Sequence, residues 1–170
     1  AIVCSMRCNR ELPTPTVLGP QVYNGLITMA VVTMICRFNT PMLAWFGNYL
    51  IPLQIGTLDM ALPRLNAFSY WVFLLGGIFM YSSFLVGKMP NGGWFGYTPL
   101  TSTPITGGAL PGHGPDFWAV GLVMLGIGSV TSGVNFIVTI LNMRAPGMTL
   151  MRLPVFVWMM LVTAFLTVFA

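Results

Sequence analysis

Three polar side chains surround the first polar connection of an otherwise apolar chain: Asn48, Asp59 and Asn66. A carboxylate at the edge of a membrane can collect protons from water, while amide side chains hold ordered waters without titrating themselves. Asp59 and Asn66 are seven residues apart, so two helical turns would align them. Alternatively, these residues could cap the neighbouring helices, with the carboxylate of Asp59 simply solvated in the loop. Spacing alone leaves both interpretations open, a proton conduit and a capped loop.

A second group of small and polar side chains lies inside the apolar run 116–143. At helical spacing, one stripe or its margin holds Gly121, Gly128, Ser132 and Asn135, and Ser129 with Gly133 forms a small-xxx-small pair. Small residues let helix backbones approach closely in lipid. Polar groups in a membrane span face a partner or water. The pattern therefore predicts tight helix contact or, alternatively, a hydrated path.

Metal chemistry is not predicted from this segment. Cys4 and Cys8 would share one helix face, Cys36 lies in an apolar run, and His113 is the single histidine of the chain. Three cysteines and one histidine in this arrangement make a poor metal site. On general grounds Trp94 is an interfacial anchor and His113 a solvated loop residue.

Composition restricts the class of protein. The chain has 170 residues, of which 56% are hydrophobic and 6% charged, and its mean hydropathy is +0.83. Soluble domains carry about 25% charged residues, so this chain could not cover a water-facing surface. It is predicted to be an integral membrane protein. Its net charge of +4 is too small to indicate a nucleic-acid partner.

Apolar runs long enough for membrane helices predict an all-α, polytopic transmembrane helix bundle. Three full spans are expected at about 22–51, 67–87 and 116–143, a partial fourth at 154–170, and the tail of a preceding helix at the start. We expect Pro52 to break the first full helix and Pro63 to open the next. Residues 1–170 are predicted to form a single membrane domain of a larger subunit, with 88–115 as an extramembrane loop.

Four blocks of the sequence resemble one family over nearly the whole chain, from about Leu12 onward. They are "FGNYLIPLQIGTLDMALPRLNAFSYW", "GWFGYTPL", "GHGPDFWAVGL" and "VNFIVTILNMRAPGMTLMRLPVFVW". These blocks resemble subunit I of the haem-copper terminal oxidases, of the bacterial cytochrome c oxidase type. The resemblance implies a partial segment, from the end of the first transmembrane helix into the fourth.

The resemblance implies a function for the complete protein. Such enzymes reduce dioxygen to water with electrons from cytochrome c and pump protons. Haem and copper would be held by the complete subunit, with the copper ligands on later helices. Implied partners are the remaining part of subunit I, subunits II and III, cytochrome c and the lipid bilayer. The implied location is the bacterial plasma membrane or the inner mitochondrial membrane. A quinol-oxidising relative is an alternative, because both kinds of oxidase share much of this stretch.

Site residues are also implied by the resemblance, residue by residue. Asp59 resembles the entrance carboxylate of the proton-uptake path called the D-channel. The other matches are Asn48, Asn66 and Asn135 for the water chain, Ser129 for a hydroxyl farther up, and Trp94 and Tyr23 for contacts to haem propionates. Gly128 stands where many members have a second serine.

The first full helix departs from the family pattern. Members carry a histidine there as an axial ligand of the low-spin haem, and the matching position is Ala30. Seven residues on, Arg37 replaces an apolar residue. A charge at the bilayer centre costs about 2.5–3.5 kcal/mol, so we expect Arg37 to face protein. Ala30 leaves open a degenerate oxidase-like subunit without the low-spin haem. A small transporter or channel is a third hypothesis, which the lack of an internal repeat disfavours.

Overall fold

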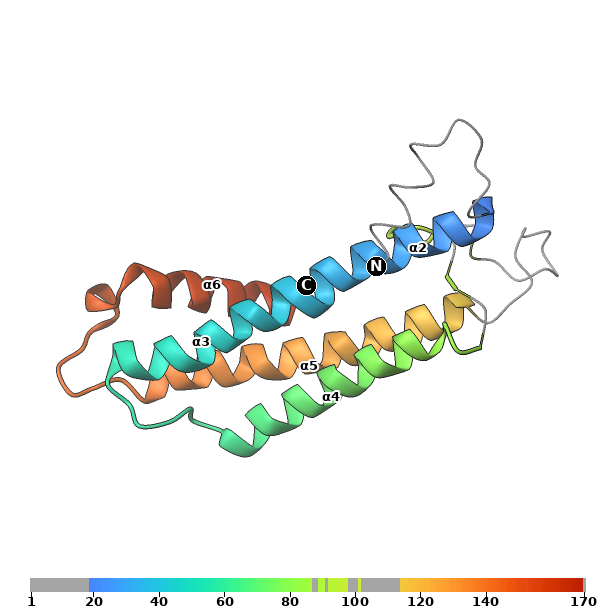
Figure 1. The fold of residues 1–170 in the computed structure, drawn as a ribbon. Coiled ribbons are helices and arrows are strands. Elements are labelled where there is room, and N and C mark those ends of the chain that lie inside the picture. The colour runs from blue at the N-terminus through green and yellow to red at the C-terminus, as the bar shows by residue number, and fades with distance from the viewer. Residues whose placement is uncertain (1–18, 87–88, 91, 98–100, 102–113, 170) are drawn as a thin grey trace. The chain divides into compact units, whose positions relative to one another are not determined.

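A computed structural model of the chain describes residues 19–86, 89–90, 92–97, 101 and 114–169, and of residues 20, 21 and 37 it describes the backbone only. All regular elements in these residues are helical (Figure 1). The predicted all-α class is therefore confirmed. The predicted helix tail at the start and most of the predicted loop 88–115 lie outside the described residues.

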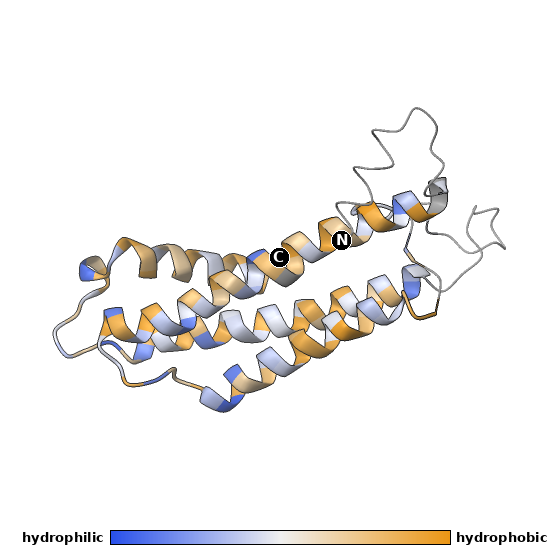
Figure 2. Ribbon diagram, in the orientation of Figure 1, coloured by the Kyte–Doolittle hydropathy of each residue, from blue (hydrophilic) through white to orange (hydrophobic). Residues whose placement is uncertain are grey.

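The helices follow the apolar runs of the sequence. They are α2 (Pro20–Val32), the π-helix η1 (Thr33–Asn39), α3 (Thr40–Ile55), α4 (Pro63–Ser82), α5 (Gly114–Asn142), the 3-10 helix η3 (Leu150–Arg152) and α6 (Val155–Phe169). By length and composition three stretches can cross a membrane: Val22–Ile55, Pro63–Ser82 and Gly114–Asn142. The shorter α6 is also apolar, as predicted for a partial fourth span. In Figure 2 hydrophilic colour marks the start of α4, whereas most of each helix is apolar or neutral.

The end of α3 corrects one prediction. Pro52 does not break the helix, which continues to Ile55. Proline removes its own N–H from the helical hydrogen bonds and crowds the carbonyl oxygen four residues earlier, but Pro52 lies in the last turn of α3, where the helix needs to continue for only three more residues. The helix ends at Gly56, whose φ of +74° is a left-handed conformation that glycine adopts without strain. The N–H of Thr57 donates to the carbonyl oxygen of Pro52 at 2.9 Å, which is the capping bond of a Schellman motif.

The start of α4 is as predicted, with Pro63 as its first residue. The missing N–H of proline is harmless there, because the first N–H groups of a helix have no helical partner. The helix begins and ends earlier than the predicted range 67–87. Its C-terminal end tightens into turns, and the N–H of Leu85 bonds to the carbonyl oxygen of Ser82 at 3.0 Å.

The chain divides into two compact units. The first comprises Ala1–Asn39 and Gly77–Leu122, and the second Thr40–Gly76 and Val123–Ala170. In the first unit one side of α2 is buried, namely Gly25, Thr28, Met29 and Val32. The loop after α4 packs there: the N–H of Gly93 donates to Oγ1 of Thr28 at 3.1 Å, and a Cβ added at Gly25 would lie 2.9 Å from Cβ of Met89.

The second unit contains the hydrophobic core. Side chains from α3, α5 and α6 meet there with the two connections. The core residues are Ile51, Ile55, Met60, Phe136, Ile140, Leu153, Val157, Leu161 and Ala164. The carbonyl oxygen of Ile55 also accepts a hydrogen bond from the N–H of Ala145 at 3.1 Å. The end of α3 is thereby tied to the connection between α5 and α6.

Candidate functional site

Asp59 lies in the connection between α3 and α4 and is exposed. Its Oδ1 accepts a hydrogen bond from the N–H of Met60 at 2.7 Å, while the Met60 side chain is buried in the core. The carboxylate is thus held at the surface by a buried neighbour. The predicted helical alignment of Asp59 with Asn66 is wrong, because α4 begins only at Pro63. Asn66 is half-buried in the first turn of α4.

Two polar side chains of α5 bind the backbone of this connection. Oδ1 of Asn135 accepts a hydrogen bond from the N–H of Leu62 at 3.1 Å. Oγ1 of Thr139 accepts one from the N–H of Ala61 at 3.0 Å. Both side chains have an exposed fraction of 0%. We call Asn135, Thr139 and the two N–H groups the α5 clamp. A buried donor left without a partner costs about 1–3 kcal/mol, so the clamp fixes the connection that carries Asp59.

Thr139 was not predicted as a site residue. Its hydroxyl also donates to the carbonyl oxygen of Asn135 at 2.7 Å, one helical turn earlier. The signal available in the sequence was the spacing of four between two polar residues of an apolar helix. That spacing predicts a shared face, but the partner on the connection is a tertiary contact.

Four buried polar atoms in the second unit have no hydrogen-bond partner among the described residues. They are Nδ2 of Asn135, Oδ1 of Asn48, Oε1 of Gln54 and Oγ1 of Thr57. Buried polar atoms without a protein partner are commonly paired with internal water. Two of these residues, Asn48 and Asn135, were predicted site residues. Sequence reasoning missed Gln54 and Thr57, since neither belongs to a recognisable motif.

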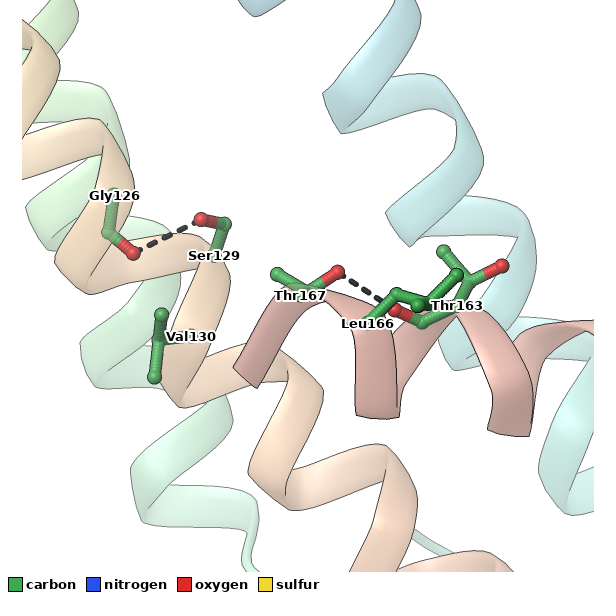
Figure 3. A pocket seen from close by; sticks show the side chains of 6 residues that line it. All are labelled: Gly126, Ser129, Val130, Thr163, Leu166 and Thr167. Carbon is green, nitrogen blue, oxygen red and sulfur yellow. Dashed lines mark hydrogen bonds between the residues drawn. The ribbon is translucent and has the colours of Figure 1, made fainter. Parts of the chain in front are cut away.

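Ser129 and Asn135 do not share a face of α5. They are six positions apart on the helix, so their side chains point about 120° apart around its axis. The Ser129 hydroxyl donates to the carbonyl oxygen of Gly126 at 2.9 Å. It lines a shallow cavity of about 510 Å³ together with residues of α6 (Figure 3). The other lining residues are Gly126, Val130, Thr163, Leu166 and Thr167.

The small residues of α5 serve close helix contacts. A Cβ added at Gly128 would lie 3.0 Å from the carbonyl oxygen of Ser69 and 3.2 Å from Cβ of Phe73, both on α4. A Cβ at Gly133 would lie 3.3 Å from the carbonyl oxygen of Ala164 on α6. Predicted helix contact is therefore confirmed at these two glycines. At Gly128 the α4 backbone occupies the space that a side chain needs.

The two predicted haem contacts lie in the first unit. Tyr23 is half-buried in the first turn of α2, and its N–H donates to the carbonyl oxygen of Gly19 at 3.0 Å. Trp94 is half-buried in a turn that follows Gly93, the residue bonded to Thr28. Both side chains carry a group that can donate to a carboxylate. In the residues that the structure describes, no hydrogen bond or ring contact joins Tyr23 to Trp94. The turn is anchored to α2 through the N–H of Gly93.

A haem ligated from position 30 of α2 does not fit the residue present there. Ala30 is half-buried and lies about 100° or more around the helix from each residue of the buried side of α2. An axial ligand must offer a lone pair to iron, and a methyl group has none. Among the described residues no group of three or more His, Cys, Asp or Glu side chains gathers. The expectations for His113, Cys4 and Cys8, and for the side chain of Arg37, lie outside the described part of the chain.

The whole chain matches one family. The family model described as cytochrome c and quinol oxidase polypeptide I matches residues 1–170. Cytochrome c oxidase subunit 1 of Corynebacterium efficiens is 44% identical over 159 residues, which is 92% of this chain and 27% of the relative.

Two relatives from Bacillus subtilis are almost equally similar. Its cytochrome c oxidase subunit 1 is 43% identical over 165 residues, 97% of this chain and 26% of the relative. Its quinol oxidase subunit 1 is 42% identical, over 97% of this chain and 25% of the relative. The chain therefore spans about a quarter of the length of these relatives.

Proposed function

Because the chain belongs to the cytochrome c and quinol oxidase polypeptide I family, we propose that it is part of the catalytic subunit of a proton-pumping cytochrome c oxidase. The complete enzyme reduces dioxygen to water. This segment carries the mouth and the middle of a D-type proton-uptake path. Residues 1–170 form one membrane domain in this proposal, with 88–115 outside the bilayer.

The buried amide of Asn135 is the observation that carries the proposal. Its Oδ1 holds the N–H of Leu62, while its Nδ2 is buried without a partner among the described residues. The Oδ1 of Asn135 thus binds the protein backbone, and its Nδ2 remains to donate a hydrogen bond to water. Asp59, two residues before the clamped backbone, is exposed and exchanges protons with bulk water. Asn48, with its buried free Oδ1, holds further water.

The division of labour follows from chemistry. Asp59 is the group that takes up and releases a proton, and the proton then passes between waters. Amides donate and accept hydrogen bonds but do not titrate near neutral pH, so they cannot trap the proton. Asn66 belongs to this path by resemblance, and Ser129 stands farther along it. The angle between Ser129 and Asn135 on α5 requires water between them.

Cofactors and partners are part of the same proposal. Haem and copper belong to the complete subunit and supply its redox chemistry. Tyr23 and Trp94 would hydrogen-bond haem propionates. Subunits II and III, the rest of subunit I and cytochrome c complete the system, in a bacterial plasma membrane or an inner mitochondrial membrane. The near-equal identity to the two Bacillus relatives keeps quinol as the alternative donor, which oxygen-consumption assays with each reductant distinguish.

The test is neutralisation of Asp59 in the complete oxidase. In Asp59→Asn the loss of the titrating group should slow proton uptake by about 10²-fold, measured with a pH dye in proteoliposomes during single turnover. Asp116→Asn, a carboxylate in the first turn of α5, is the matched control. Uptake at the parental rate in Asp59→Asn would reject the proposed path.

Ala30 supports a second candidate, an oxidase-like subunit without the low-spin haem. Its structural and proton-conducting roles would remain. The reduced-minus-oxidised spectrum of the native complex decides between the two, since the low-spin haem has its own band. A full band, with two haems extracted per complex, contradicts the second candidate.

A further inference from the structure

We propose that Gln54 and Thr57 form a water-binding pair beside Asp59 and orient the water that exchanges protons with its carboxylate. This inference rests on the function proposed for Asp59. Gln54 and Thr57 act here as positioning residues, because neither side chain titrates in the relevant pH range.

The backbone at this site is fixed on both sides. The N–H of Thr57 is bonded to the carbonyl oxygen of Pro52, and Gly56 provides the left-handed turn. The carbonyl oxygen of Ile55 is bonded to the N–H of Ala145. A Cβ added at Gly56 would lie 3.3 Å from Cβ of Ala145, so the turn is packed against a neighbouring segment. The start of the Thr57 side chain is therefore held in a defined position by the backbone.

The hydroxyl of Thr57 differs from most other threonine hydroxyls of the second unit. In helices, threonine hydroxyls bond the carbonyl oxygen one turn earlier, as Thr131 and Thr163 do here. Thr57 follows the helix end, where its N–H bonds the carbonyl oxygen of Pro52, five residues earlier, and the helical geometry that brings a hydroxyl to the carbonyl oxygen four residues earlier is no longer present. Its Oγ1 is buried without a partner among the described residues, as is Oε1 of Gln54. Two acceptors three residues apart therefore remain for water.

Asp59 lies within reach of this water. Asp59 is two positions after Thr57 in the sequence. Consecutive Cα atoms are about 3.8 Å apart, so the Cα atoms of Thr57 and Asp59 are at most about 7.6 Å apart. One or two waters span such a distance. Water held by Gln54 and Thr57 donates one hydrogen to Oε1 of Gln54 and accepts the hydroxyl hydrogen of Thr57. One lone pair then remains to accept a proton from Asp59, and the second hydrogen of the water passes to the next water of the path. The carboxylate is then free to take the next proton from bulk water.

The experiment uses the complete oxidase with Gln54→Leu and, separately, Thr57→Val. Each should slow single-turnover proton uptake by about three- to tenfold, the factor that one or two lost hydrogen bonds correspond to. The solvent deuterium isotope effect on uptake should rise, while the haem spectra stay parental. Thr57→Ser, which keeps the hydroxyl, should restore the parental rate. Thr163→Val is the matched control, because its hydroxyl bonds the carbonyl oxygen of Met159 within α6.

The outcomes separate this inference from the function on which it rests. If Asp59→Asn slows uptake but Gln54→Leu and Thr57→Val do not, the water pair is rejected and the proposed path stands. If Asp59→Asn also leaves uptake unchanged, both are rejected. Should the variants fail to assemble, a high-resolution structure of the parental complex replaces them. An ordered water within about 3.2 Å of both Oε1 of Gln54 and Oγ1 of Thr57 supports the pair. The absence of water density at this position overturns it.

Discussion

The helices α2 and α5 each use a buried polar side chain to hold the backbone of a connection, Thr28 on α2 and Asn135 on α5, but they differ in whether the position proposed for function is one of these. On α5, Asn135 and Thr139 are fully buried and hold the backbone of the connection before α4. On α2, the position expected to bind a cofactor is Ala30, and the buried side of the helix consists of other residues. Asn135 thus serves both the fold and the proposed proton path, while Thr139 serves the fold. On α2 the position matched to a haem ligand lies off the buried side of the helix, so we expect substitutions there to affect packing less than substitutions in the α5 clamp.

The largest effect is expected at Asn135. In Asn135→Leu the N–H of Leu62 loses its acceptor and the buried donor Nδ2 disappears. The free energy of unfolding of the complex should fall by about 2–3 kcal/mol, and proton uptake should be lost with it. Thermal unfolding and single-turnover uptake measure the two parts. Asn142→Leu, an exposed amide at the end of α5, is the control. A stable but inactive Asn135→Leu would break the comparison, since Asn135 would then serve function alone.

Gly128→Val tests the contact between α4 and α5. The new side chain meets the carbonyl oxygen of Ser69 at 3.0 Å, and overpacking of this kind costs about 1–3 kcal/mol. We expect a lower melting temperature of the complex. Gly126→Ala on the same helix is the matched control, because nothing lies within 4 Å of a Cβ there. It should raise stability by about 0.5–1 kcal/mol. Equal effects of the two substitutions would contradict the close approach at Gly128.

Thr139→Val removes only the second bond of the α5 clamp. The shape of the side chain is kept, but the N–H of Ala61 loses its acceptor, which should cost about 1 kcal/mol. Thermal unfolding measures the loss. Thr131→Val, whose hydroxyl bonds the carbonyl oxygen of Ile127, should cost less because no backbone N–H is left unpaired. A larger loss for Thr131→Val would show that the clamp does not stabilise this unit.

The smallest effect on stability is expected at Ala30. Ala30→His introduces an imidazole away from the buried side of α2, and stability should change by no more than about 0.5 kcal/mol. If an opposing ligand is present in the complete subunit, the spectrum should gain a low-spin haem band. Ile27→His, one turn earlier and 38% exposed, is the control that should give no such band. A strongly destabilised Ala30→His would mean that the position belongs to the packing after all.

Local features of the sequence predicted much of the fold. Apolar runs gave the spans, and Pro63 predicted the start of α4, because both depend on neighbouring residues. Pro52 misled the prediction of the α3 end, since the left-handed turn at Gly56 rather than proline ends that helix. The role of Thr139 depends on a contact between residues 78 positions apart, and the burial of the Gln54 and Thr57 oxygens depends on the folded chain. Periodicity alone does not contain them.

The α5 clamp also determines when the connection that carries Asp59 is fixed during synthesis. Its two hydrogen bonds join residues that are 73 and 78 positions apart. A protein chain is synthesised from its N-terminus to its C-terminus. Ala61 and Leu62 are therefore made well before Asn135 and Thr139. Until α5 exists, their N–H groups have no acceptor from it and the segment around Asp59 is not fixed. The proposed proton entrance is therefore completed late in biogenesis, and a chain arrested before residue 135 would carry Asp59 without the α5 side chains that hold its connection.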